Sequence, residues 1–230
     1  HHRPLPGPAA VDSLAIVEDL LRQGLPELGI PQDEALVTAF ASYLRLLAQW
    51  NENINLTGIR ELADMVPLHI LDSLTARPFL KGERIVDVGC GAGLPGIPLA
   101  LVDRLAEPAR HFTLVDGTLK KIRFVQQAIA DLGLANAEAL HVRIEDHKPV
   151  PLYDTAICRA VSSLPDFVRR AGGVVAPGGQ LLAMKGKLPA DEIKALPKGW
   201  RASAVTPVKI PGVDAERHIV QIVRGQLARK

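Results

Sequence analysis

Residues 83–96 read ERIVDVGCGAGLPG, and this stretch decides the fold. A short apolar run from Ile85 to Val88 leads into four closely spaced glycines and Pro95. Glycines permit backbone angles and close approaches that a Cβ would block, and proline suits the first turn of a helix. The stretch therefore predicts a strand, a tight turn and a helix N-terminus, an arrangement that holds nucleotide-like ligands against bare backbone.

Two classes of cofactor fit this turn. The spacing Gly91-x-Gly93-x-x-Gly96 matches the dinucleotide fingerprint, and Asp116 follows the next strand-like run, where a ribose-binding carboxylate belongs. Asp87, one residue inside the first strand, attracts an amine-bearing ligand and repels a pyrophosphate. It favours S-adenosylmethionine, and the pattern Asp-x-Gly-x-Gly-x-Gly resembles motif I of the Rossmann-like methyltransferases. A turn that binds nothing is the third alternative.

Composition places the chain among ordinary soluble globular proteins. Its 230 residues are 47% hydrophobic and 23% charged, which suits one core with a small appended domain. No apolar run reaches the length of a membrane span and no signal peptide is recognisable, so we expect a cytoplasmic protein without membrane contact. The only two cysteines, Cys90 and Cys158, argue against a disulfide framework or a zinc site, and no metal is expected.

The charges divide unevenly along the chain. Residues 1–80 hold 5 Lys/Arg and 10 Asp/Glu, whereas residues 81–230 hold 22 and 15. A polyanion is therefore expected to bind mainly to the later part of the chain. The excess is modest, so it permits a nucleic-acid partner without requiring one.

The first 80 residues predict helices only. Apolar residues recur at helical spacing, and Gly24 and Pro26 are expected to end the first helix. Four helices are expected, at residues 11–23, 33–49, 60–66 and 68–77.

From residue 83 onward strands and helices alternate, which is typical of a parallel sheet covered on both faces. The last part differs, because three strand candidates follow with only one short helix among them, which predicts a closing antiparallel pair. Strands are expected near 84–88, 111–116, 138–142, 153–158, 179–185, 202–210 and 218–224, and helices near 95–103, 118–132, 164–172 and 189–196.

We therefore expect an α/β fold, the Rossmann-like class I methyltransferase fold, with a mostly parallel sheet and an antiparallel C-terminal strand. The expected domains are an N-terminal helical subdomain at residues 1–80 and a cofactor-binding domain at residues 81–230.

Further candidate site residues lie at the expected strand ends. Asp116 suits both ribose hydroxyls, with a plain helix cap as the alternative. Ile144 and Glu145 suit the edge and amino group of an adenine, although a polar loop explains them equally well. Arg159 is placed to hold a phosphate or an incoming base. Cys158 beside it is a candidate nucleophile for cytosine methylation, which the lack of a Pro-Cys dipeptide disfavours.

Several short motifs occur in order along the chain. They are Trp50-Asn51-x-x-x-Asn55-Leu56-Thr57, His69-x-x-Asp72-Ser73, Asp87-Val-Gly-x-Gly-x-Gly-Leu-Pro-Gly96, Lys121-x-Arg123-Phe124, Arg143-x-Glu145, Arg159-Ala160, Lys185-Gly186 and Glu216-Arg217-His218. Together they resemble the RsmG (GidB) family of bacterial 16S ribosomal RNA guanine-N7 methyltransferases, over nearly everything after residue 35.

The resemblance implies S-adenosylmethionine as the cofactor, bound through Gly89, Leu94, Ile144, Glu145 and Arg159. The residues of the turn and the second strand add Asp87, Gly91, Gly93 and Asp116 to the cofactor-binding candidates. The implied partner is 16S ribosomal RNA, either as free RNA or within the 30S subunit or an assembly intermediate, and we expect a monomer. Candidate RNA contacts are Arg123, Lys185, Arg217, Asn55 and His69, and buttressing of the pocket is the alternative role for the last two.

Guanine N7 already carries a lone pair, so its methylation needs positioning and no general base. Arg159 is the candidate positioning group, at the phosphate or the O6 edge of the target guanine. Two other functional classes remain as alternatives. Asp87 and the short C-terminal tail disfavour a dinucleotide oxidoreductase, and the intact glycine turn and Asp116 disfavour a catalytically silent RNA-binding module.

Overall fold

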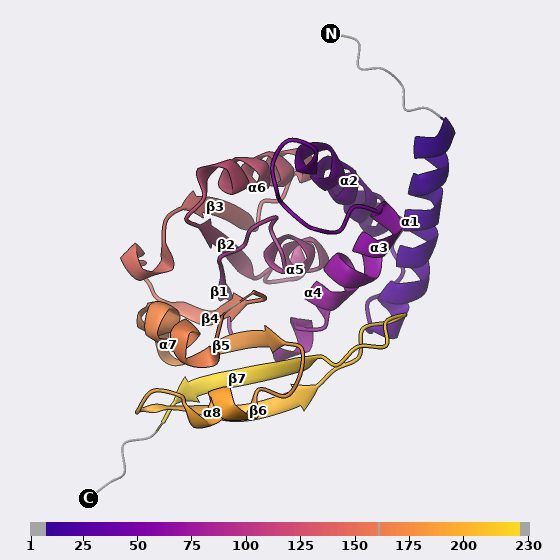
Figure 1. Ribbon diagram of the computed structural model, residues 1–230. Coiled ribbons are helices and arrows are strands. Elements are labelled where there is room, and N and C mark those ends of the chain that lie inside the picture. The colour runs from indigo at the N-terminus through magenta and orange to yellow at the C-terminus, as the bar shows by residue number, and fades with distance from the viewer. Residues whose placement is uncertain (1–7, 161, 226–230) are drawn as a thin grey trace, which may run out of the picture.

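The computed structural model describes residues 8–160 and 162–225, and within them a seven-stranded sheet carries the fold (Figure 1). The strand order is β3-β2-β1-β4-β5-β7-β6. The strands are β1 (Arg84–Val88), β2 (His111–Asp116), β3 (Ala137–His141), β4 (Tyr153–Cys158), β5 (Val175–Lys185), β6 (Trp200–Pro207) and β7 (His218–Arg224). The pairings among β1 to β5 are parallel, and β7 runs antiparallel to both of its neighbours. The predicted fold class is confirmed.

Helices cover both faces of this sheet. They are α1 (Pro8–Glu27), α2 (Glu34–Asn51), α3 (Leu62–Met65), α4 (Asp72–Leu74), α5 (Gly96–Asp103), α6 (Leu119–Leu132), α7 (Leu164–Ala171) and α8 (Ala190–Lys194). A π-helical segment (Val66–Leu71) joins α3 to α4, and 3₁₀ turns occur at Arg77–Phe79, Ile144–Asp146 and Gly172–Val174.

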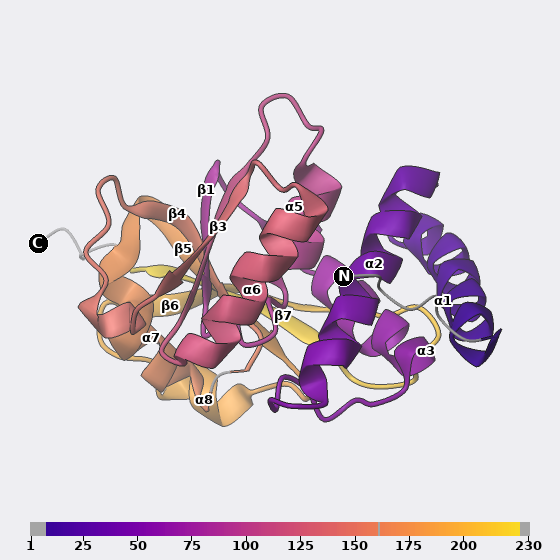
Figure 2. The ribbon, with the colours of Figure 1, turned by 90° about the horizontal axis from the view of Figure 1, so that it is seen from above.

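Side chains along the strands alternate between two hydrophobic layers. Ile85 of β1 packs in the layer that holds α5 and α6, whereas Val86 and Val88 pack in the layer that holds α7. The first layer also contains Leu21 of α1 and Phe40 of α2. Figure 2 shows α2 beside α6, with α1 on the outer side of α2. The core is continuous across residue 80, so a division of the chain there stays a prediction.

The first helix is longer than its sequence predicts. α1 continues through Gly24 and Pro26 and ends at Glu27. A Cβ on Gly24 would lie 2.5 Å from Leu71 Cδ1, so the glycine allows the π-helical segment to approach α1 closely. Leu25 is fully buried, and this packing outweighs the helical hydrogen bond that Pro26 cannot make.

The two short helices expected at 60–66 and 68–77 form one continuous helical segment from Leu62 to Leu74. Pro67 has no N–H, and in an α-helix its ring would clash with the carbonyl group four residues earlier. The wider π-helical turn accommodates this proline without breaking the helix. Such turns are common at functional sites.

The strands begin and end close to the positions that the sequence predicts. β1, β2, β4 and β7 have the predicted bounds, whereas β5 begins earlier, at Val175, and β6 lies two to three residues before its predicted place. β6 is an edge strand with few buried side chains, so its sequence carries a weak signal. Among the described residues, no helix combines the length and the apolarity that crossing a membrane requires.

The continuous core predicts that the helices and the sheet unfold together. Phe40→Ala should lower the free energy of unfolding by about 3–5 kcal/mol, because Phe40 is fully buried between α2 and the rest of the layer. Ile16→Ala on α1, where the side chain is 53% exposed, should change it by less than about 0.5 kcal/mol. Chemical denaturation followed by circular dichroism measures both variants. A separate early transition of the helices in Phe40→Ala would contradict the shared core.

Candidate active site

The turn between β1 and α5 presents bare backbone at the carboxyl edge of the sheet. Gly89, Gly91 and Gly93 have φ angles of +67°, +53° and +89°. Apart from the glycine and its two chain neighbours, no described atom lies within 4 Å of the place where a Cβ would stand on Gly89 or Gly91, so this face of the turn is open. At Gly96 the opposite holds, because a Cβ would lie 2.8 Å from Asp87 Oδ2. The glycines therefore serve both the open face and the close packing behind it.

Contacts from two other elements fix the turn. The backbone N–H of Gly91 donates to Asp116 Oδ2 at the end of β2, over 2.9 Å. The hydroxyl of Tyr43, on α2, donates to the carbonyl oxygen of Ala92 over 2.6 Å. Tyr43 is fully buried, so the N-terminal helices support the turn directly.

Asp87 is buried behind the turn, and one of its two carboxylate oxygens makes no hydrogen bond with the described residues. Its Oδ2 accepts a hydrogen bond from the Gly96 N–H over 2.8 Å, and its Oδ1 is buried without a hydrogen-bond partner. Burial raises the pKa of Asp87 well above its usual range, while the Gly96 N–H and Arg159 act in the opposite direction. An unpaired buried carboxylate oxygen is a ready acceptor for an ammonium group. This oxygen therefore suits the ammonium group of S-adenosylmethionine.

Asp116 has remaining capacity for a ligand. Its Oδ2 accepts from Gly91 and its Oδ1 accepts from the Thr118 N–H over 2.8 Å. Each carboxylate oxygen keeps a second lone pair, which suits the two hydroxyls of a ribose. The side chain lines a cavity of about 180 Å³ at the ends of β1 and β2.

Two predicted adenine contacts line the same cavity. Ile144 is buried and begins a 3₁₀ turn after β3, and Glu145 is exposed. The carboxylate of Glu145 lies 3.0 Å from Arg170 Nε, so an arginine on α7 already pairs with it. Gly89 is the fourth predicted cofactor residue that lines this cavity. The other predicted residues do not line it; they are Asp87, Gly91, Gly93, Arg159 and Leu94, which is buried in the turn.

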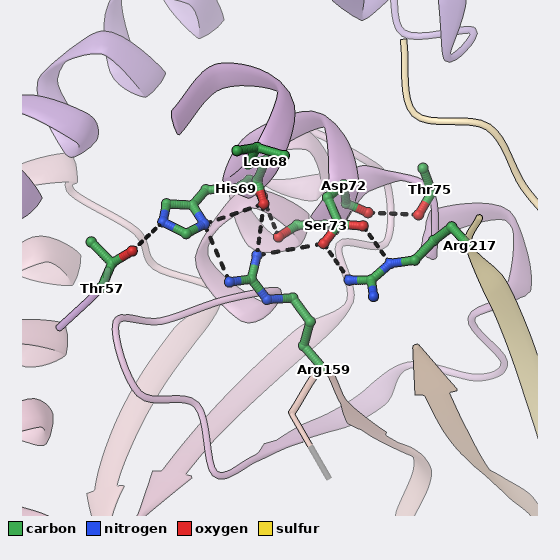
Figure 3. A network of polar contacts seen from close by, with 8 residues as sticks. All are labelled: Thr57, Leu68, His69, Asp72, Ser73, Thr75, Arg159 and Arg217. Carbon is green, nitrogen blue, oxygen red and sulfur yellow. Dashed lines mark hydrogen bonds and ion pairs between the residues drawn. The ribbon is translucent and has the colours of Figure 1, made fainter. Parts of the chain in front are cut away.

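Arg159, directly after β4, binds the π-helical segment (Figure 3). Its Nη1 donates to the carbonyl oxygen of Leu68 over 3.2 Å and lies 3.5 Å from Asp72 Oδ2. Its Nη2 lies 3.2 Å from His69 Nδ1. The guanidinium group is thus held between a carbonyl, an imidazole and a carboxylate.

The same carboxylate holds a second arginine. Arg217, just before β7, donates from Nε to Asp72 Oδ1 over 2.6 Å and from Nη2 to Asp72 Oδ2, which is a bidentate ion pair (Figure 3). The Asp72 side chain is 5% exposed, whereas the side chains of Arg159 and Arg217 are 21% and 17% exposed. Asp72 therefore lies beneath two arginines that both reach solvent.

His69 is neutral in this network. Burial, followed by the charge of Arg159, lowers its pKa to about 4. His69 Nδ1 lies 3.2 Å from Arg159 Nη2 and 3.2 Å from the carbonyl oxygen of Leu68, and Nε2 lies 2.7 Å from Thr57 Oγ1, so both ring nitrogens are engaged. Thr57 in turn accepts from the Ile59 N–H over 3.0 Å. The geometry matches the buttressing alternative for His69.

The remaining predicted RNA contacts, Asn55, Arg123 and Lys185, do not take part in this network. Asn55 is exposed in the loop after α2, and Arg123 is exposed on α6. Lys185 ends β5 with its Nζ 3.0 Å from Glu192 Oε1, and its side chain is 15% exposed. The structure therefore brings together His69, Arg159 and Arg217 of the predicted residues.

Cys158 does not suit nucleophilic catalysis. The residue is buried, and burial raises the pKa of its thiol to about 12. A thiol that stays protonated at neutral pH is a poor nucleophile. The alternative of cytosine methylation through Cys158 is not supported.

Comparison with known proteins decides among the remaining alternatives. The family model GidB, described as rRNA small subunit methyltransferase G, matches residues 37–220. The chain belongs to the GidB family. It is 44% identical over 208 residues to the Ribosomal RNA small subunit methyltransferase G of Nitrosococcus oceani, covering 90% of this chain and 95% of that protein. For the protein of the same name from Aromatoleum aromaticum the identity is 44% over 205 residues, covering 89% and 97%.

Solved structures share the fold of this GidB chain at low identity. A SAM-dependent methyltransferase from Thiobacillus denitrificans, in complex with S-adenosyl-L-homocysteine, has a TM-score of 0.51 at 12% identity and covers 78% of this chain and 98% of its own. A ribosomal protein L11 methylase from Lactobacillus delbrueckii has a TM-score of 0.52 at 13% identity and covers 77% and 93%. The GidB chain is a methyltransferase of the S-adenosylmethionine-dependent class, and the oxidoreductase alternative is excluded.

Two residues of this GidB site escaped prediction. Asp72 was visible only as a member of the His69-x-x-Asp72-Ser73 motif, and nothing in the sequence pairs it with arginines far along the chain. Tyr43 belongs to the apolar stripe of α2, and such a position predicts packing but not a hydrogen bond to the glycine turn.

The Tyr43 hydrogen bond predicts a coupling between stability and cofactor affinity. Tyr43→Phe leaves the Ala92 carbonyl oxygen without its partner, so unfolding should become easier by about 1–2 kcal/mol and S-adenosylmethionine should bind up to about tenfold more weakly. Tyr153→Phe is the matched control, because Tyr153 is also buried and its hydroxyl contacts His147 Nε2 away from the turn. Chemical denaturation measures the unfolding free energy of each variant, and titration calorimetry measures its affinity for S-adenosylmethionine. Equal affinity in the two variants would contradict the role of Tyr43.

The neutral His69 predicts acid lability. Its pKa is about 4 in the folded protein and 6.5 when unfolded, so the unfolded chain binds the proton first. The stabilisation is complete above pH 6.5 and is lost as the pH falls toward 4, by up to about 3 kcal/mol. His69→Gln should flatten the pH dependence of the unfolding free energy in this window, measured by urea denaturation. Parallel curves for variant and wild type would contradict the assignment.

Proposed function

We propose that this chain transfers a methyl group from S-adenosylmethionine to N7 of a specific guanine in 16S, small-subunit ribosomal RNA. The observation that carries the proposal is that the chain belongs to the GidB family, whose model is described as rRNA small subunit methyltransferase G. Its glycine turn also has an open face where a cofactor can bind. The proposed substrate is the 30S subunit or an assembly intermediate, and the proposed state is a cytoplasmic monomer.

The cofactor is assigned to residues at the ends of the first three strands. Asp87 suits the ammonium group through its unpaired oxygen, Asp116 suits the ribose, and the turn at Gly89 and Gly91 leaves space for the ligand. Gly93, Leu94, Ile144 and Glu145, together with Arg159 after β4, complete the proposed set. When bound, S-adenosylmethionine supplies an electrophilic methyl group on a sulfonium.

The residues around the turn suit a transfer that needs no general base. Guanine N7 attacks with its own lone pair, so placement of the base is the main requirement. The low pKa of His69, about 4, and the contacts of both its ring nitrogens make it a weak base, and the buried Cys158 thiol is protonated and a poor nucleophile. Arg159 is the proposed positioning group, because it is partly exposed at the edge where β4 ends.

Cationic side chains around this edge supply the proposed contacts to RNA. Arg217 lies beside Arg159, and Lys185 ends the neighbouring strand β5. Arg123 on α6 and Asn55 in the loop after α2 are exposed and extend the proposed surface.

Labelled methyl transfer tests the proposal. Unmodified small ribosomal subunits and their stripped RNA are incubated with the protein and labelled S-adenosylmethionine, followed by nucleoside analysis. We expect labelled 7-methylguanosine, and Arg159→Ala should lower its yield by about 100-fold. Arg104→Ala is the matched control, since Arg104 follows α5 at the opposite end of that helix and should leave transfer unchanged. Label in another nucleoside would overturn the guanine-N7 assignment.

A further inference from the structure

One buried carboxylate contacts the two arginines that lie nearest the proposed guanine site. Asp72 touches both Arg159 and Arg217, and both guanidinium groups keep an exposed portion. With His69 neutral, two positive charges face one negative charge in this cluster, which leaves one positive charge in excess. A single negatively charged group of the substrate would balance it.

The planar geometry of the cluster suits a phosphodiester. A bidentate pair fixes the plane of the Arg217 guanidinium group, and the Leu68 carbonyl with His69 fixes that of Arg159. Fixed guanidinium groups bind the oxygens of a phosphate with little loss of side-chain entropy. The Arg217 contact to Asp72 uses Nε and Nη2, so Nη1 remains for another acceptor.

We infer that Asp72 is a positioning residue, which holds Arg159 and Arg217 in the orientation that binds one RNA phosphate beside the target guanine. The inference rests on the proposed function and adds to it the group that both arginines bind and the residue that orients them. Without the carboxylate, both arginines would still attract RNA, but they would no longer hold it in one place.

The two alternative roles of Asp72 differ in the signs of their effects. A purely structural residue would, when removed, weaken both RNA binding and turnover. A residue that merely repels RNA would, when removed, strengthen both. A positioning residue gives opposite signs, because the variant gains a net positive charge yet loses the orientation of the arginines.

Asp72→Asn tests the inference with three measurements on the folded variant. S-adenosylmethionine affinity should fall no further than it does in Arg159→Ala, since among the described residues the Asp72 carboxylate contacts Arg159 and Arg217 and no residue of the glycine turn. RNA affinity, measured by anisotropy with a labelled small-subunit RNA fragment, should rise, and its salt dependence should steepen by about one released counterion. The kcat for methyl transfer should fall at least about tenfold.

Asp103→Asn is the matched control. Asp103 is equally buried and also contacts two arginines, Arg77 and Arg110, but it lies at the far end of α5. Its substitution should lower stability while leaving kcat and the salt dependence of RNA binding unchanged. A loss of kcat as large as that of Asp72→Asn would show that removing any buried carboxylate has this effect, and would overturn the inference.

Combination with Arg159→Ala tests whether Asp72 acts through the arginine. In that background Asp72→Asn should lower kcat by a smaller factor than it does in the wild type, because one of the two arginines that it orients is already absent. An undiminished effect would overturn the inference. If Asp72→Asn does not fold, Arg217→Lys replaces it, since lysine keeps the charge but cannot form the bidentate pair. That variant should lose kcat at least about fivefold with RNA affinity within about twofold, and unchanged kcat would overturn the inference.

Failure of the proposed function gives a different result. Absence of methyl transfer by the wild-type protein would overturn the proposed function alone. The anisotropy measurements need no turnover, so they still decide whether removal of the Asp72 carboxylate tightens RNA binding and steepens its salt dependence. Unchanged binding in Asp72→Asn would overturn the role of the carboxylate.

Discussion

The parallel order of the strands is the constraint on which the rest of this structure depends. Parallel strands end at one edge of a sheet, so side chains from distant parts of the chain meet there. Asp87 is the last residue but one of β1, Asp116 ends β2 and Arg159 follows β4, so all three lie at this edge. The glycine turn, the cavity at Asp116 and the arginine pair are consequences of that arrangement.

Two side chains outside the cofactor cavity hold the residues at this edge of the sheet in place. Tyr43 holds the glycine turn through the Ala92 carbonyl group, and Asp72 holds the two arginines. Both come from the N-terminal helices, which share a hydrophobic core with the sheet. The helical part of the chain is therefore part of the construction of the site, and it does more than cover the sheet.

Local patterns were sufficient to predict the sheet and its edge. β1, β2, β4 and β7 follow apolar runs bounded by turn residues, and their positions imply where Asp87, Asp116 and Arg159 lie. The patterns failed where packing at a distance decides the structure. Two separate helices were expected at residues 60–66 and 68–77, but a π-helical turn that accommodates Pro67 makes them continuous. The arginine partners of Asp72 lie far along the chain. No local signal encodes contacts of that kind.

The pairing of Asp72 with Arg217 has a consequence for the order of folding. The two residues are 145 positions apart, and 90 positions separate His69 from Arg159. Contacts of such long sequence separation form late, because much chain entropy must be lost before they are made. During synthesis, which proceeds from the N-terminus, the helices that carry Asp72 emerge well before Arg217. The arginine pair is thus completed only on a nearly finished fold, so an incomplete chain does not present the fully assembled cationic cluster to the RNA around it.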